Sequence, residues 1–155
     1  MTAGVSRAAT AEVVSAGAEP VVLAEGLRRA DVLSLHAPSL PETRHMIGEA
    51  ELGMLRPGAT LINTARGALV DTAALERVCV AGRLDAILDV TDPEPLPASS
   101  PLYDLPNVLL TPHVAGSLGS ETRRMADAAL TELERYGAGL PPQSPVTRES
   151  LVVQA

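Results

Sequence analysis

Aromatic side chains are nearly absent from this 155-residue sequence, which contains two Tyr and neither Phe nor Trp. Lysine is also absent, so all 12 basic side chains are Arg. At 46% hydrophobic residues the chain is long enough to bury a sizeable core, and that core has to be built from aliphatic side chains. A charged fraction of 20% is typical of a folded domain rather than a disordered one.

Other absences exclude whole classes of protein. A single cysteine, Cys79, allows no internal disulfide and indicates a reducing, cytoplasmic setting, with Cys79 as a small core residue. The net charge of −7 argues against nucleic-acid binding. No apolar run approaches the ~18 residues of a membrane span, and we expect no secretory signal. No cluster of His, Cys, Asp and Glu has metal-ligand spacing, so we predict no metal.

Short apolar segments alternate with amphipathic ones, which is typical of β-α-β construction. Strands are expected at 32–36, 59–64, 84–90 and 108–111, and helices at 49–55, 72–81 and 120–136. Asp71 is expected to cap the second helix. In the third helix, Leu130, Leu133 and Tyr136 are expected to be buried. The Pro-rich segment 91–106 is expected to be a loop without helix.

Near-continuous apolar strands joined by helical crossovers predict an α/β fold with a parallel sheet covered on both faces. Ligands of such open sheets bind beyond the carboxyl ends of the strands. Four of those ends carry chemically distinctive residues: His36, Arg66, the loop with Glu94, and His113. We therefore expect a site at this edge.

Arg66, Glu94 and His113 match the needs of reducing a 2-keto acid. An Arg pairs bidentately with the substrate carboxylate and stays charged. A His gives or takes a proton near neutral pH, and a carboxylate beside it favours its protonated form. Taken alone, Arg66 reads as a solvated surface group, His113 as a structural hydrogen bonder and Glu94 as a loop charge. Their joint position at strand ends favours catalysis.

Four motifs occur in order: HAP at 36–38, NTARG at 63–67, DVTDPEP at 89–95 and TPHVAGS at 111–117. Together they resemble the D-isomer-specific 2-hydroxyacid dehydrogenase family, which includes phosphoglycerate dehydrogenase and glyoxylate/hydroxypyruvate reductase. The resemblance runs from about residue 17 to residue 136. It implies a Rossmann-type doubly wound sheet, an NAD cofactor (NADP not excluded) and a small 2-hydroxy or 2-keto acid as substrate. It also implies a homodimer for the complete enzyme.

The resemblance assigns roles to individual residues. The family's catalytic arginine falls on Arg66, the acid paired with histidine on Glu94, and the proton-donating histidine on His113. The family's cofactor contacts, at the nicotinamide end, its carboxamide and the dinucleotide groove, fall on His36, Ala37, Pro38, Thr64, Ala65, Arg66, Asp89, His113, Ala115 and Gly116.

The sequence departs from the family in lacking G-x-G-x-x-G, the turn that holds the cofactor pyrophosphate at a helix N-terminus. We expect a partial dinucleotide-binding domain at 1–138, without the first strand and its glycine loop, and a tail at 139–155 that in relatives returns toward the substrate domain. The strand at 32–36 should then have an unpaired apolar edge, and NAD should bind weakly. Thr91 stands where relatives usually carry an aromatic residue.

These features leave two functions open. One is an NAD-dependent oxidoreductase acting on a 2-hydroxy or 2-keto acid. The other is a truncated, catalytically inactive remnant or interaction module of the same family. A formate dehydrogenase is disfavoured, because its site uses a glutamine where Glu94 stands. Which hydroxy acid is used is not readable from the sequence.

Overall fold

The computed structural model describes residues 2–3 and 7–148. In chain order the elements are β1 (Thr2–Ala3), α1 (Arg7–Ser15), β2 (Pro20–Val21), α2 (Leu23–Arg29), β3 (Val32–Leu35), α3 (Glu49–Met54), β4 (Thr60–Asn63), α4 (Thr72–Val80), β5 (Asp85–Leu88), β6 (Val108–Leu110) and α5 (Ser120–Gly137). Single 3-10 turns occur at Pro41–Thr43, Gly67–Leu69 and Pro101–Tyr103.

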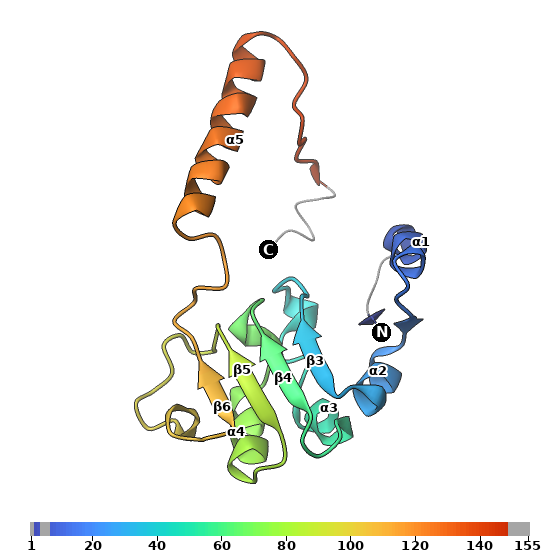
Figure 1. The fold of residues 1–155 in the computed structure, drawn as a ribbon, viewed down its shortest axis with the longest axis vertical. Coiled ribbons are helices and arrows are strands. Elements are labelled where there is room, and N and C mark those ends of the chain that lie inside the picture. The colour runs from blue at the N-terminus through green and yellow to red at the C-terminus, as the bar shows by residue number, and fades with distance from the viewer. Residues whose placement is uncertain (1, 4–6, 149–155) are drawn as a thin grey trace.

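Four strands form one parallel sheet in the order β3-β4-β5-β6 (Figure 1). All four predicted strands and all three predicted helices are confirmed, with ends within two residues of the expected ones. Among the described residues the outer edge of β3 has no strand partner, as expected. A separate parallel pair, β1 and β2, flanks α1 and was not predicted.

Local chemistry explains where α3 and α4 begin and end. Asp71 caps α4 as predicted, because its carboxylate accepts a hydrogen bond of 3.0 Å from the Ala74 N–H. The chain leaves α4 through Gly82, whose φ of 63° is in the left-handed region. Arg83 then donates hydrogen bonds of 2.6–2.9 Å to the carbonyls of Leu52, Gly53 and Leu55 at the C-terminal end of α3.

Within residues 2–3 and 7–148 the core lies on one face of the sheet, so for this part of the chain the expectation of two covered faces is wrong. In successive strands Leu35, Leu61, Ala86 and Leu88 point to the buried face, where Cys79 is also buried, as predicted. The alternate positions point to the other face and remain open or half-buried: Val32, Ser34, Thr60, Ile62, Asp85, Ile87 and Leu109. The strands therefore carry apolar side chains on both faces of the sheet, although the described helices cover one face.

Two further expectations are corrected. The segment 91–106 contains the 3-10 turn Pro101–Tyr103, begun by Ser100, whose hydroxyl accepts a hydrogen bond from the Leu102 N–H. Helix α5 has no buried residue: Leu130, Leu133 and Tyr136 are 56%, 64% and 83% exposed. The physical reason is visible in Figure 1, where α5 projects away from the sheet and finds no core to pack on.

The described part of the tail runs back along α5. The carboxylate of Glu132 accepts hydrogen bonds from the N–H groups of Gln143 and Ser144, and Arg135 donates to the Pro141 carbonyl. Residues 149–155 of the expected tail lie outside the described residues. Over the part of the chain that is described, no helix is both long and apolar enough to cross a bilayer.

Candidate active site

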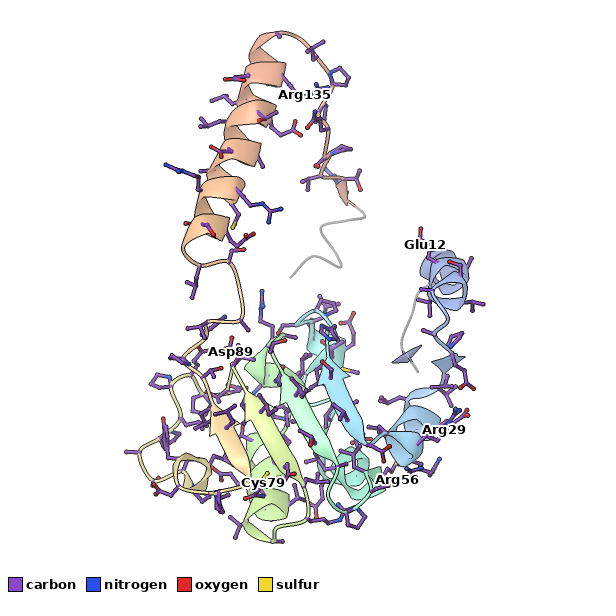
Figure 2. The ribbon with its side chains drawn as sticks, in the orientation of Figure 1. Glu12, Arg29, Arg56, Cys79, Asp89 and Arg135 are labelled. Carbon is purple, nitrogen blue, oxygen red and sulfur yellow. The ribbon has the colours of Figure 1, made fainter. Side chains whose placement is uncertain are left out.

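The carboxyl ends of the four parallel strands meet at one edge of the sheet, where Figure 2 labels Asp89, opposite the end that carries Cys79. Each of the predicted site residues lies just beyond β3, β4, β5 or β6. The sheet therefore brings the four motifs of the sequence to a common edge.

The turn after β4 is shaped by a buried amide. Asn63, the last residue of β4, is fully buried, and its Nδ2 donates to the Arg66 carbonyl at 2.9 Å while its Oδ1 accepts from the Ala65 N–H at 3.1 Å. These two bonds satisfy the buried amide and fix the backbone that carries Arg66.

The Arg66 side chain is exposed at the mouth of this turn. Its guanidinium donates to the carbonyl of the preceding Ala65 at 2.7 Å, and no carboxylate of the described residues forms an ion pair with it. Most of the donors of the planar fork are thus left for an external carboxylate.

Asp89 directly follows β5 and is 3% exposed. Its carboxylate accepts hydrogen bonds from the Thr111 hydroxyl at 2.5 Å and from the N–H groups of Val114 and Ala115 at 2.8 Å each. Burial acts to raise the pKa of Asp89, but the three hydrogen bonds and the neighbouring His113 outweigh it and lower the pKa below its ordinary value. A buried carboxylate therefore holds the 111–115 loop on both sides of His113.

His113 and Glu94 form a direct pair. The imidazole Nδ1 lies 2.7 Å from the Glu94 Oε1, and because a carboxylate only accepts, Nδ1 carries the proton of this bond. The Nε2 atom is then the free, reactive nitrogen of the ring. The backbone of His113 has a φ of 54°, in the left-handed region that few non-glycine residues adopt. About half of each side chain is exposed.

A pocket of about 680 Å³ opens beside this pair. Its wall combines the polar side chains of Glu94 and His113 with apolar groups of Pro95, Leu96 and Leu110. A pocket with a few convergent polar groups on an apolar wall is the usual form of a small-molecule site.

The predicted cofactor contacts lie at the same edge. The His36 Nε2 is 2.8 Å from the Ser34 hydroxyl, next to Ala37 and Pro38, and Thr64 and Gly116 are exposed. The Ala115 N–H, in contrast, is bound to Asp89. A carboxylate offers about four lone-pair sites, so Asp89 keeps capacity for one more donor. The role of these residues in cofactor binding stays a prediction.

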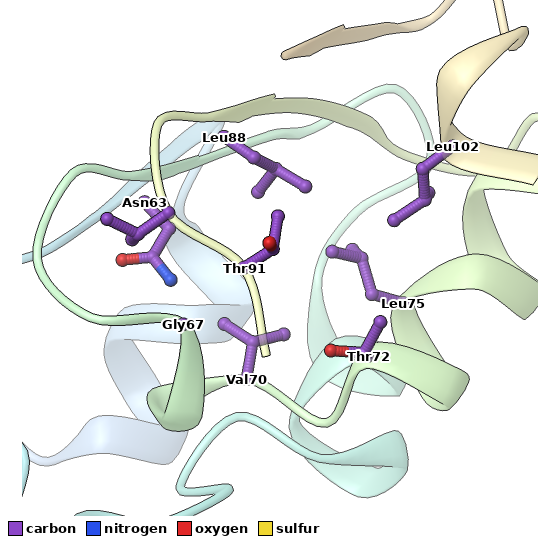
Figure 3. A pocket seen from close by; sticks show the side chains of 9 residues that line it. Asn63, Gly67, Val70, Thr72, Leu75, Leu88, Thr91 and Leu102 are labelled. Atoms are coloured by element: carbon purple, nitrogen blue, oxygen red, sulfur yellow. The ribbon is translucent and has the colours of Figure 1, made fainter. Parts of the chain in front are cut away.

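A smaller cavity lies on the core side of the site (Figure 3). Thr91 lines it together with Val70, Leu75, Leu88 and Leu102. Thr91, which stands where relatives usually carry an aromatic residue, is therefore in contact with this cavity. Among the described residues, no group of three or more His, Cys, Asp and Glu side chains is arranged to hold a metal ion.

Sequence reasoning gave no role to Asn63, Thr111 or Gly67, all of which shape this site. The available signal for Asn63 was an amide side chain at the end of a strand, immediately before a turn, where it bonds the local backbone. For Thr111 the signal was a hydroxyl next to Pro112. The groups that these three residues contact are either distant in the sequence or backbone atoms, and a sequence pattern alone does not reveal such contacts.

Comparisons with known proteins identify the family of this chain. Residues 2–115 match the family described as "D-isomer specific 2-hydroxyacid dehydrogenase, NAD binding domain", so the likeness begins earlier than the expected residue 17. The glyoxylate reductase of Aeropyrum pernix is 42% identical over 89% of this chain and 42% of its own length.

Two solved structures show the same fold. The apo form of D-mandelate dehydrogenase from Rhodotorula graminis has a TM-score of 0.84 and 31% identity, over 94% of this chain and 43% of that one. The NAD complex of a D-isomer specific 2-hydroxyacid dehydrogenase from Lactobacillus delbrueckii ssp. bulgaricus has a TM-score of 0.77 and 34% identity, over 86% and 44%. The chain thus spans less than half the length of these relatives. It belongs to the D-isomer specific 2-hydroxyacid dehydrogenase family and corresponds to its NAD-binding domain.

Proposed function

We propose that this chain provides the catalytic side chains of an NAD-dependent oxidoreductase that interconverts a small 2-hydroxy acid and the corresponding 2-keto acid. The observation that carries the proposal is the 2.7 Å contact between His113 Nδ1 and Glu94 Oε1 at the carboxyl edge of the sheet. That contact turns a surface histidine into one with a fixed ring and a defined free nitrogen.

In the reduction direction, the Arg66 guanidinium would bind the substrate carboxylate and orient the keto group. When bound, NADH would supply the hydride that the C2 atom of the keto acid accepts. His113 would give its Nε2 proton to the O2 atom as negative charge develops there, leaving a neutral imidazole and a 2-hydroxy acid. Glu94 would hold the ring and neutralise the charge of the imidazolium before the transfer.

The residues at the strand ends fit the nicotinamide end of the dinucleotide better than its pyrophosphate. At the strand ends, Thr64 and Gly116 are exposed, and a Cβ added to Gly116 would meet no atom within 4 Å, so a flat ring has room to approach. The sequence offers no glycine-rich turn for the pyrophosphate. We therefore expect weak cofactor binding by the chain alone.

The proposal is tested by following NADH oxidation with glyoxylate, hydroxypyruvate and pyruvate. We expect His113→Gln to lower kcat by about 10²-fold or more, as loss of a general acid does, and Arg66→Ala to act chiefly on KM. Thr131→Val on α5 is the control, because its hydroxyl bonds only to the Asp127 carbonyl of its own helix. Unchanged turnover in both site variants would rule out the assignment.

A second candidate function is a non-catalytic interaction module. It is favoured by the outer edge of β3, which pairs with no strand of the described residues, and by the open sheet face beside it, with Val32 58% and Leu109 55% exposed. Isothermal titration with NADH separates the two candidates. Saturable binding counts against the module, and no heat at millimolar NADH counts against the oxidoreductase.

A further inference from the structure

Arg66 and the Glu94–His113 pair come from different loops, and no side-chain hydrogen bond or ion pair joins Arg66 to either partner. A reaction that binds the carboxylate at one and protonates oxygen at the other needs a fixed spacing between them. The question is which contact of the described residues sets that spacing.

The two loops touch at Gly67, the residue after Arg66. A Cβ atom built on Gly67 would lie 2.0 Å from the Thr91 carbonyl oxygen, 2.1 Å from the Thr91 carbonyl carbon and 2.7 Å from the Asp92 nitrogen. Real Cβ atoms essentially never approach closer than 3.0 Å. Because all three atoms belong to the backbone, no rotamer change relieves the clash.

Glycine is required at position 67 because a side chain has no space there. It is not required by the backbone conformation, since the φ of Gly67 is not positive. Gly67 begins the 3-10 turn Gly67–Leu69 and follows the turn that Asn63 holds by two hydrogen bonds. On the other side, the Thr72 hydroxyl donates to the Asp92 carbonyl at 2.5 Å. Figure 3 shows Gly67, Thr72 and Thr91 around the same small cavity. Both segments are therefore pinned at this contact.

Anything larger than hydrogen at Gly67 would have to separate the segments by about 1 Å, the difference between 2.0 Å and 3.0 Å. The Asp89 N–H is bound to the Asn63 carbonyl at 3.0 Å, so the upstream end of the 89–94 segment stays in place. The displacement would pass downstream to Glu94, while Asp89 keeps the His113 loop where it is.

We propose that Gly67 is a positioning residue, which sets the spacing between Arg66 and the Glu94–His113 pair by letting two backbones meet. The effect of Gly67 on catalysis rests on the proposed function, whereas its effect on the spacing does not. Misplacement of reacting groups by 1 Å costs on the order of 10²-fold in rate, so Gly67→Ala should lower kcat/KM for the keto acid by that factor.

The first measurement needs no activity. In ¹⁵N NMR spectra of the 155-residue chain, Gly67→Ala should shift the imidazole resonances of His113 and the Nε resonance of Arg66. Gly53→Ala is the matched control: Gly53 lies on the exposed side of α3 and an added Cβ meets no atom within 4 Å. Unmoved His113 and Arg66 resonances in Gly67→Ala would overturn the proposal.

The second measurement is a double-mutant cycle on kcat/KM. If Gly67 sets the spacing between Arg66 and the Glu94–His113 pair, the loss should depend on Arg66, so Gly67→Ala should cost about 10²-fold in the native background but less than about 3-fold in Arg66→Ala. An equal loss in both backgrounds would mean a general structural defect and would overturn the proposal. If the native chain shows no turnover but the resonances shift in Gly67→Ala, the proposed function is disproved. The role of Gly67 in setting the spacing is then still supported.

Should Gly67→Ala fail to fold, Thr72→Val decides instead. It removes the hydroxyl that bonds the Asp92 carbonyl while keeping the side-chain volume, so the same resonances should shift by a smaller amount. Thr131→Val removes a comparable hydroxyl from the distant helix α5 and serves as its control. Identical His113 resonances in Thr72→Val and Thr131→Val would overturn the proposal.

Discussion

Asp89 shows how one buried carboxylate can organise a site without itself facing solvent. Its two oxygens receive three hydrogen bonds from residues that flank His113, and these bonds outweigh the cost of burying the charge. The backbone of His113 has a φ of 54°, a conformation that most residues avoid. The bonds to Asp89 supply the free energy that keeps the loop in this conformation.

We expect Asp89→Asn to lower the free energy of unfolding by about 2 kcal/mol or more, because an amide has one acceptor oxygen and turns its N–H₂ group toward backbone donors. Urea denaturation followed by circular dichroism measures this. Asp85→Asn on the same strand is the control, since Asp85 is exposed and should change the free energy by less than about 0.5 kcal/mol.

The same residue predicts a pH dependence. The pKa of Asp89 is lower in the folded chain than its ordinary value of about 3.9, so its contribution to stability is complete above that pH. The contribution is lost as the pH falls through the folded pKa, when the carboxylate takes up a proton. The native chain should therefore lose more stability below about pH 4 than Asp89→Asn does. Parallel pH profiles of the two proteins would contradict this role.

At the scale of elements, α4 and α5 are both amphipathic helices but differ in burial. In α4 Leu75 is 2% exposed and packs in the core, whereas in α5 Leu133 is 64% exposed. We expect Leu75→Ala to lower the free energy of unfolding by about 2–5 kcal/mol and Leu133→Ala to change it by less than about 0.5 kcal/mol. Urea denaturation of both variants measures the difference. A comparable loss in Leu133→Ala would mean that α5 packs against something in solution.

The same pair of helices shows what the sequence could predict. Apolar periodicity located α4 and α5 correctly, and Asp71 marked the start of α4. Periodicity gives the direction of an apolar stripe but not the surface that covers it, so the predicted burial of Leu133 was wrong. For the same reason, apolar periodicity did not reveal that the half-buried Ile62 and Ile87 lie on an open face of the sheet.

For the site, the rule that ligands bind beyond strand ends pointed to Arg66, Glu94 and His113, which the structure places beyond β4, β5 and β6 and whose roles stay a prediction. The structure adds the 2.7 Å contact within the histidine pair, which no spacing in the sequence could give. Gly67 was missed because its partner, the Thr91 carbonyl, is a backbone atom of another loop. A contact between two backbones restricts the residue type of the glycine but not that of its partner.

On the scale of the whole molecule, the one-sided core leaves apolar surface exposed. Val32 lies on the open face in β3, whose outer edge has no strand partner within residues 2–3 and 7–148, and Leu109 lies in β6 at the opposite edge of the same sheet. An open apolar face beside an unpaired strand edge favours association between chains. We therefore expect the isolated chain to associate as its concentration rises.

Val32→Lys should weaken that association roughly tenfold, which corresponds to about 1.4 kcal/mol and is close to the value of burying one Val side chain. The matched control is Val80→Lys, because Val80 is equally exposed, 58% in both cases, but lies on α4, on the side away from the open face. Both variants make the net charge less negative by one, so a general charge effect cancels. Sedimentation velocity over a range of concentrations measures the association constant. If the two variants weaken association equally, or if the native chain stays monomeric at high concentration, the open face and the β3 edge are not what brings chains together.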